Sequence, residues 1–375
     1  MKAIVLKENL KDALSTGEGV STKSISLPIL NCLLLSAEKN FLQIEATDLE
    51  LGIRFRILSK NEEEGRTVIS SKSFSQFLSL IKENQLTLTT KNNNLQVLGK
   101  GFTTVLKGLN PEDFPIIPNL KGDEPFLEVE AQMLCRGLSS IAGFTGQTQT
   151  RPEISGVLFL LQKNTLKLVA TDSFRLGEKT LYLGEGNSLD ASLIVPAKTC
   201  RELIGIFGEL PGKLRVSLSP TLVAFDYENQ ERLELPKIQL VSRIIEGEYP
   251  HYQDVIPVKC QTTVLLEKTE FVNQLKASAM FSGKTNEVRL VFDPKEQQVS
   301  FSAKNLDTGE HASSMKAKVE GAPQEISFNW RFLLDGILHI ANEEVELGLT
   351  GQESPVLVKP KTEEGYLYVA MPIKA

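Results

Sequence analysis

The sequence predicts an α+β fold in which one domain is repeated three times along 375 residues. The main observation is a recurring segment: residues 41–57 read FLQIEATDLELGIRFRI, and residues 165–183 read TLKLVATDSFRLGEKTLYL. A looser copy, QVSFSAKNLDTGEHASSMKA, occupies residues 298–317. Ala46 and Ala170, which begin the shared Ala-Thr-Asp, are 124 positions apart, and Ala303 follows 133 positions later.

A second landmark keeps nearly the same spacing. A short apolar strand leads into a helix that carries a base at its start: Lys72, Lys198 and Arg331, separated by 126 and 133 positions. This period far exceeds the roughly 20–50 residues of solenoid and propeller repeats. Each copy is therefore expected to be a domain with its own core.

Proline-rich segments place the boundaries between the copies. Residues 110–115 read NPEDFP and residues 246–250 read EGEYP. Proline suits connections better than the interior of an element. The predicted domains are an N-terminal domain, 1–124, a central domain, 125–256, and a C-terminal domain, 257–375.

Each copy is expected to open with a short strand and a helix. Apolar residues at helical spacing predict the helices, and polar turns such as AEKN and QKN predict hairpins between the strands that follow. A second helix and further strands complete each copy, which gives the order β-α-β-β-β twice per domain. The opening strand and helix pairs are 2–6 with 8–14, 126–129 with 131–141, and 262–266 with 268–280; the next strands are 29–36, 42–46, 157–161, 166–170, 288–292 and 299–303.

Open sheets with bare edges invite pairing with other chains. Sheets joined between neighbouring domains would cover those edges, so the repeat favours a closed assembly.

Composition indicates an ordinary globular chain, with 41% hydrophobic and 23% charged residues. No apolar run approaches the roughly 18 residues of a membrane span, and the N-terminus lacks the features of a secretory signal. Four widely spaced cysteines favour reduced thiols and a cytoplasmic location. The formal net charge of −6 argues against a protein that wraps nucleic acid tightly, but not against local basic surfaces.

No motif for catalysis, a metal or a cofactor is found. The Gly-Lys-Thr of residues 283–285 lacks the upstream glycine and strand of a phosphate-binding loop, which favours a helix-terminating turn. Asp48 and Asp172 form a conceivable catalytic pair, but Asn305 takes the same place in the third copy. Asp and Asn stabilise turns by accepting hydrogen bonds from nearby backbone amides. We therefore favour a structural role in the turns for these residues over a catalytic role in a metal-independent hydrolase.

The basic residues indicate an external anion. A helix start normally favours an acidic side chain, yet Lys72, Lys198 and Arg331 share this position, and Arg201 follows Lys198 by one turn. The alternative is ordinary solvated surface charge, which the sequence leaves open.

Several segments together resemble the bacterial DNA polymerase III beta subunit, the sliding clamp. The resemblance spans the whole chain, and its most specific parts are Ala-Thr-Asp-Ser-Phe-Arg-Leu at residues 170–176 and the tail at residues 368–374. Other matching segments are LPIL at 27–30, DFP at 113–115 and GVLF at 156–159.

The resemblance implies a head-to-tail homodimer that closes into a six-domain ring, with helices inside, sheets outside and duplex DNA passing through. The interface would join the region of Leu106 to that of Met280. Sequence-independent contacts with phosphates would allow sliding. The DNA-facing bases would be Lys23, Lys72, Arg151, Lys198, Arg201 and Arg331.

The family also binds short peptides of polymerases, the clamp loader and repair proteins in a pocket between the second and third domains. An apolar cleft with a few orienting polar groups suits such peptides. By position, this chain supplies Ile154, Thr171, Ser173, Phe174, Arg175, Leu176, Pro250, Val255, Asn329, Phe332, Pro355, Val369, Ala370, Met371, Pro372 and Ile373.

The chain departs from the family pattern at several pocket positions, which would shift peptide preference. Ser173 replaces a common glycine, Phe174 a histidine or similar residue, and Asp254 a frequent arginine. Thr285 stands where an aromatic residue can occur, and Ala375 replaces a terminal leucine.

Near Arg151, Pro152 and Glu153 replace two tyrosines of some members, which puts direct DNA contact there in doubt. A second hypothesis therefore remains beside the clamp: a monomeric acidic scaffold that binds peptides but does not encircle DNA.

Overall fold

The computed structural model describes residues 1–21, 27–120, 125–148, 150–184, 189–228, 235–362 and 365–374. The chain divides into two compact units. The first contains Met1–Cys135 and Lys198–Ile244, and the second contains Arg136–Ala197 and Ile245–Ala375. In the part of the chain that is described, no helix is long and apolar enough to cross a membrane.

The N-terminal third has the predicted order, with two additional short strands, Lys60–Glu63 and Gly108–Leu109, and two changed boundaries. The first helix continues to Val20, because Leu10, Leu14 and Gly17 extend its buried face and Gly17 lies against Leu33, where a Cβ atom would be 2.9 Å from Cδ2. The predicted strand from residue 29 begins instead with a 3-10 turn, η1 (Pro28–Asn31), because Pro28 occupies its first position. The elements are β1 (Lys2–Leu6), α1 (Lys7–Val20), β2 (Cys32–Glu38), β3 (Phe41–Thr47), β4 (Leu51–Leu58), β5 (Lys60–Glu63), β6 (Gly65–Ser70), α2 (Ser71–Leu80), β7 (Gln85–Lys91), β8 (Asn94–Gly99), β9 (Phe102–Leu106), β10 (Gly108–Leu109) and the 3-10 turn η2 (Pro111–Asp113).

The central third repeats the order, and its first helix has the predicted bounds. Its elements are β11 (Phe126–Glu130), α3 (Ala131–Ile141), β12 (Gly156–Gln162), β13 (Thr165–Thr171), β14 (Arg175–Tyr182), β15 (Ala191–Pro196), α4 (Ala197–Phe207), β16 (Lys213–Leu218), β17 (Leu222–Tyr227) and β18 (Ile238–Arg243), with the 3-10 turns η3 (Ala142–Phe144), η4 (Pro152–Ile154) and η5 (Tyr252–Val255).

The C-terminal third repeats the order once more, with one additional short strand, Lys318–Gly321. The predicted turn after its first helix is confirmed, since the helix ends at Ala279. The elements are β19 (Thr262–Glu267), α5 (Lys268–Ala279), β20 (Glu287–Asp293), β21 (Gln298–Asn305), β22 (Gly309–Lys316), β23 (Lys318–Gly321), β24 (Gln324–Asn329), α6 (Trp330–Leu338), β25 (Glu344–Leu349), β26 (Val356–Pro360) and β27 (Tyr366–Ala370).

Side-chain caps define where several helices begin. At the start of α2, Ser70 Oγ accepts a hydrogen bond of 3.4 Å from the Ser73 amide. At the start of α6, Asn329 Oδ1 accepts one of 3.0 Å from the Arg331 amide. The carboxylate of Glu267 accepts from two amides at the start of α5. These bonds satisfy amides that have no partner within the helix.

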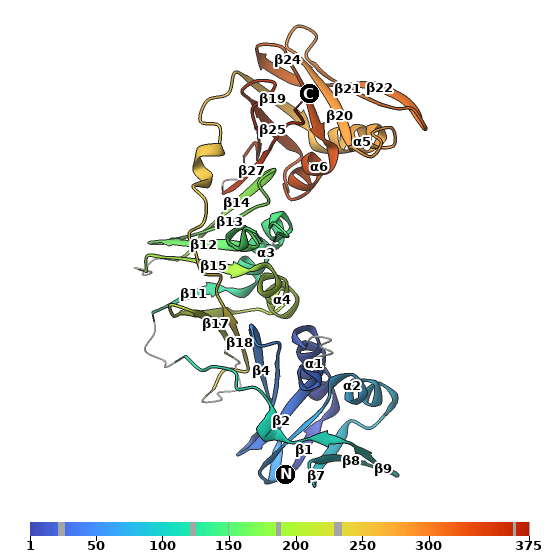
Figure 1. The fold of residues 1–375 in the computed structure, drawn as a ribbon, viewed down its shortest axis with the longest axis vertical. Coiled ribbons are helices and arrows are strands. Elements are labelled where there is room, and N and C mark those ends of the chain that lie inside the picture. The colour runs from blue at the N-terminus through green and yellow to red at the C-terminus, as the bar shows by residue number, and fades with distance from the viewer. Residues whose placement is uncertain are drawn as a thin grey trace. The chain divides into compact units, whose positions relative to one another are not determined.

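In the first unit, a nine-stranded antiparallel sheet runs from the first third of the chain into the second. Its order is β10-β6-β2-β3-β4-β18-β17-β16-β11, and the pair β4 and β18 makes the junction with Ile238 opposite Phe55. A five-stranded sheet, β5-β1-β7-β8-β9, belongs to the first third alone. In Figure 1, α1 and α2 lie together on the same side of these strands.

The second unit has the same arrangement. A nine-stranded sheet, β15-β12-β13-β14-β27-β26-β25-β19-β23, crosses from the second third to the last through the pair β14 and β27. A four-stranded sheet, β22-β21-β20-β24, completes the unit, and α5 lies beside α6 (Figure 1). The expectation that sheets continue between neighbouring domains is therefore confirmed at both junctions.

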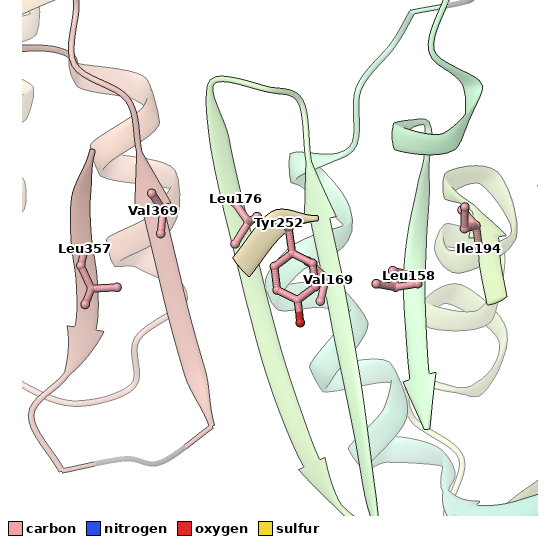
Figure 2. Close-up of a cluster of buried hydrophobic side chains, with 7 residues drawn as sticks. All are labelled: Leu158, Val169, Leu176, Ile194, Tyr252, Leu357 and Val369. Atoms are coloured by element: carbon pink, nitrogen blue, oxygen red, sulfur yellow. The ribbon is translucent and has the colours of Figure 1, made fainter. Parts of the chain in front are cut away.

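A hydrophobic stripe crosses the second of these sheets. Figure 2 shows one buried side chain from each of six consecutive strands, from Ile194 on β15 to Leu357 on β26, with Tyr252 of η5 beside them. Their burial removes apolar surface from water on both sides of the β14–β27 junction, which stabilises the junction. The members of the stripe are Leu158, Val169, Leu176, Ile194, Tyr252, Leu357 and Val369.

Candidate peptide pocket and basic helix starts

The repeated Ala-Thr-Asp segments form matching turns. Asp48 Oδ1 accepts from the amides of Glu50 and Leu51 at 3.0 and 2.6 Å, and Asp172 Oδ1 accepts from Phe174 and Arg175 at 2.9 and 3.0 Å. Asn305 Oδ1 accepts from the Asp307 amide at 2.8 Å in the third copy. The turn role expected from the sequence is confirmed.

Next to the second of these turns, the structure forms a hollow of about 210 Å³. Four chain segments build it: Arg151 just before η4, the β13–β14 turn, the segment around η5 and the end of β27. Tyr252, Leu176 and Val369 contribute both to this hollow and to the hydrophobic stripe, so its floor is part of the core. Its lining residues are Arg151, Thr171, Ser173, Phe174, Arg175, Leu176, Pro250, His251, Tyr252, Val255, Val369 and Met371.

Nine of the sixteen residues assigned to a peptide pocket from the sequence line this hollow. The other seven do not line it, although Phe332 of α6 stacks on Phe174 with ring centroids 6.4 Å apart. Asn329 instead caps α6, and Ile154 is buried beneath Gly146. The seven are Ile154, Asn329, Phe332, Pro355, Ala370, Pro372 and Ile373.

The hollow also has lining residues that sequence reasoning did not assign to it. His251 and Tyr252 follow Pro250 directly, so proximity along the chain was the available signal. Tyr252 donates to Glu178 Oε2 at 2.8 Å, and burial followed by this bond raises the pKa of its phenol. Arg151, which the sequence assigned to DNA, lines the hollow as well.

Arg175 is the central charged group of this region. Its Nε donates to Asp172 Oδ2 at 2.9 Å, and its Nη1 pairs with the carboxylate of Asp335 on α6. The guanidinium carbon lies 5.2 Å from the ring centroid of Phe144 and 4.9 Å from that of Phe332. Two carboxylates and two aromatic faces therefore hold the side chain in place.

Ser173 occupies a left-handed backbone conformation, with φ of 77°. This region strains residues other than glycine, so the backbone at Ser173 is strained. The serine hydroxyl accepts from Arg151 Nη1 at 3.1 Å, and Arg151 Nε pairs with Glu153 at 3.2 Å. The departure at residue 173 thus fixes a cation at the mouth of the hollow.

The three repeated bases have the same structural position. Lys72, Lys198 and Arg331 are each the second residue of a helix, in α2, α4 and α6 respectively. Lys72 and Arg331 are exposed, as is Arg201, whereas Lys198 is partly buried and pairs with Asp48. Lys23 lies outside the described residues.

The residues assigned to a dimer interface lie in different units. Leu106 ends β9, the edge strand of the five-stranded sheet, and Met280 follows α5 with 72% of its surface exposed. In the described ranges, no group of three or more His, Cys, Asp or Glu side chains is arranged to hold a metal ion.

Repeated β-α-β-β-β units, joined in pairs through continuous sheets, define a DNA-clamp fold. Three family models, all of the DNA polymerase III beta subunit, match successive parts of the chain. The model of the N-terminal domain matches residues 1–118, that of the central domain residues 128–251, and that of the C-terminal domain residues 253–374. The chain belongs to the DNA polymerase III beta subunit family, whose members are non-catalytic processivity factors.

Individual relatives cover the chain end to end. The beta sliding clamps of Synechocystis and of Chlamydia muridarum are each 25% identical, over all of this chain and 99% of theirs. The crystal structure of the Bacillus subtilis DNA polymerase sliding clamp has a TM-score of 0.93 at 20% identity, covering all of this chain and 99% of that one. A Pseudomonas aeruginosa sliding clamp bound to griselimycin has a TM-score of 0.92 at 23% identity, with full coverage of both.

Proposed function

We propose that this protein is a sliding clamp that encircles duplex DNA and tethers the replicative polymerase. The main support for this function is that three beta-subunit domain models match one after another along the chain. The base at the second position of α2, α4 and α6 supports it, because a cation at the same place in every domain suits a repeated phosphate backbone.

In the proposed assembly, two chains join head to tail, and six domains form a ring with helices inside and sheets outside. The edges of β9 and β22, in the five- and four-stranded sheets, are free for pairing. Leu106 and Met280 supply apolar surface at the contact. A heterologous interface of this kind closes when its rotation completes a ring.

DNA is held by topology rather than by tight contacts. Lys23, Lys72, Lys198, Arg201 and Arg331 face the DNA and make sequence-independent contacts with phosphates. Arg151 has a second role at the mouth of the pocket. The net charge of −6 is compatible with this arrangement, because only the inner surface needs to be basic.

The hollow beside η5 takes the short peptides through which the replicative polymerase subunit, the clamp loader and repair proteins attach. Its apolar floor suits aliphatic and aromatic anchors, and the fixed cations of Arg151 and Arg175 orient the chain.

The protein acts without catalysis, metal or cofactor, in the cytoplasm, with domains at 1–124, 125–256 and 257–375. Opening and loading of the ring rely on a separate ATP-driven loader.

The test is retention on DNA of defined topology. The clamp is loaded onto nicked circular plasmid by its cognate loader and ATP, separated by gel filtration, and the plasmid is then cut once. We expect retention on the circle, loss from the linear form, a solution mass of two chains and a ring in negative-stain images. Equal retention on both forms, or a monomer without a hole, would favour the acidic peptide-binding scaffold instead.

A further inference from the structure

Tyr252 belongs both to the peptide pocket beside η5 and to the hydrophobic stripe beneath it. Only 6% of its surface is exposed, and its phenol donates to Glu178 Oε2 at 2.8 Å. Figure 2 shows the ring over β13 and β14, with the hydroxyl oxygen directed away from the turn that joins these strands. A hydrogen bond to an ionised acceptor is stronger than a neutral one, so this contact fixes the ring.

The carboxylate of Glu178 is itself held by a second partner. Its Oε1 accepts from Lys167 Nζ of the neighbouring strand β13 at 3.3 Å, and only 13% of the Glu178 side chain is exposed. Burial, followed by the bond to this carboxylate, raises the pKa of the Tyr252 phenol, so the phenol remains a donor in alkaline solution as well. Lys167, Glu178 and Tyr252 thus form a chain of interactions from the sheet to η5.

Tyr249 fastens the same segment at a second point. Its hydroxyl donates to Val169 O at 3.4 Å, and its ring meets that of Tyr252 edge to face, with centroids 6.5 Å apart. The pocket residues Pro250 and His251 lie between the two tyrosines in the chain. Because both bonds go to β13 and β14, whose connecting turn supplies other lining residues, they set the position of one part of the lining relative to the other.

The first junction uses the same position of the repeat. Counted by strand pairing from the repeated turns, Arg54 on β4 is equivalent to Glu178 on β14. Arg54 donates to the carbonyl oxygens of Ile117 and Pro118, at 3.3 Å for Pro118, in the segment that leads to the central domain. In the third copy, where β22 is a sheet edge, this position is Ala312. The polar side chain is thus present at both junction strands, where a connecting segment must be held.

We propose that Glu178 is a positioning residue of the peptide pocket: through Tyr252 it holds η5 in the conformation that receives a short peptide, and so sets the affinity for that peptide. This inference rests on the proposed function of the pocket. Glu178 is not among the described residues that line the hollow, so its effect passes through Tyr252. If the binding-competent conformation is populated only part of the time, the apparent Kd rises in inverse proportion to that fraction.

The test examines the pocket with and without a peptide in the full-length protein. Without a peptide, hydrogen exchange reports the order of residues 249–256. The peptide probe is the tightest binder among overlapping peptides of about ten residues that cover the replicative polymerase subunit, and calorimetry measures its affinity. The variants are Glu178→Ala, Glu178→Gln, Tyr252→Phe and the double variant Glu178→Ala with Tyr252→Phe; thermal unfolding shows that each is folded.

Glu178→Ala and Tyr252→Phe are each expected to speed exchange over residues 249–256 and to weaken the peptide about tenfold. This is the change that follows if the competent conformation is then populated about one tenth of the time. The double variant should bind no more weakly than either single variant, because both remove the same hydrogen bond, whereas two independent effects on stability would add. Glu178→Gln keeps an acceptor for the phenol and should stay within about threefold of the original affinity.

Glu346→Ala is the matched control. Glu346 pairs with Lys359 at 2.9 Å on neighbouring strands of the same sheet, as Glu178 does with Lys167, but does not contact Tyr252 through a hydrogen bond. This variant should leave both the exchange of residues 249–256 and the peptide affinity unchanged.

The inference is overturned if Glu178→Ala binds the peptide as the original does, if the two losses add in the double variant, or if Glu178→Gln is as weak as Glu178→Ala. Unchanged exchange in Glu178→Ala, with a peptide still bound by the original protein, contradicts this inference alone. A protein that binds none of the peptides contradicts the proposed function of the pocket, and this inference with it.

Discussion

The ammonium group of Lys198 is paired with the carboxylate of Asp48, a residue from the first copy of the repeated turn. Asp48 uses its other oxygen to cap that turn, and its side chain is only 9% exposed. One carboxylate therefore fixes both the turn and the base that begins α4. The repeat makes Lys72, Lys198 and Arg331 equivalent in position, but this pair makes Lys198 different in charge.

The first prediction concerns DNA affinity. Lys72→Ala and Arg331→Ala should each lower the slope of log affinity against log salt by about one, because each removes one phosphate contact. Lys198→Ala should lower it less, since Asp48 already neutralises this lysine. The measurement is fluorescence anisotropy on linear duplex DNA over a salt series.

Asp48→Asn is the matched control for this comparison. The amide oxygen still caps the turn, but the negative charge is gone, so Lys198 should contribute fully and the slope should rise. An equal loss of slope in all three alanine variants would contradict the argument from the Lys198–Asp48 pair.

The second prediction concerns the peptide pocket. Met371 lines the hollow, and its amide donates to Phe174 O at 2.8 Å. Met371→Glu should weaken a peptide from the replicative polymerase at least about 100-fold, because a carboxylate in an apolar site loses hydration without gaining a partner. Met371→Leu, which keeps volume and polarity, should bind nearly as the original does. Calorimetry measures both, and an unchanged solution mass shows that assembly is retained.

The third prediction separates strain from hydrogen bonding at Ser173. Ser173→Gly relieves the left-handed conformation but removes the hydroxyl that holds Arg151. Ser173→Ala removes the hydroxyl and keeps the strain. The glycine variant should exceed the alanine variant in unfolding free energy by about 1 kcal/mol. Chemical denaturation measures the difference; equal stabilities would mean that residue 173 is unstrained.

The fourth prediction tests the proposed interface with opposite charges. Leu106→Lys and Met280→Glu should each give a monomer when purified alone, because each places an unpaired charge in an apolar contact. In an equimolar mixture, one interface gains a Lys–Glu pair and the other keeps the original residues. Mass photometry should therefore detect dimers only in the mixture. A mixture that stays monomeric would show that residues 106 and 280 do not meet.

The fifth prediction concerns the thiols. Burial raises the pKa of Cys135 to about 12, so at pH 8 only about one molecule in ten thousand carries its thiolate. Burial also raises the pKa of Cys32, Cys200 and Cys260, but Cys260 is the one thiol of the four that is only partly buried and thus accessible to reagent. Ellman's reagent should thus find one accessible thiol in the folded protein and four after denaturation. Cys260→Ser should remove the native signal, and a second fast thiol would contradict the assignment.

Much of the fold followed from the sequence because it rests on local signals. Apolar spacing along residues 131–141 predicted α3 with its observed bounds, and the repeated turn segments predicted matching hairpins. The predicted helix over residues 8–14 was too short, because α1 continues to Val20 and packs Gly17 against Leu33, a contact that lies far along the chain.

The sequence by itself determined the threefold repeat, the order of elements in each copy, the turn role of Asp48, Asp172 and Asn305, and the family. It could do so because hydrophobic period and turn chemistry are properties of short stretches of chain. Only the tertiary structure decided which side chains meet. The pairing of Lys198 with Asp48 and of Arg175 with Asp335, and the place of Arg151 in the hollow, all join residues distant in sequence. Such contacts depend on strand register and on the packing of helices against sheets, which no single segment encodes.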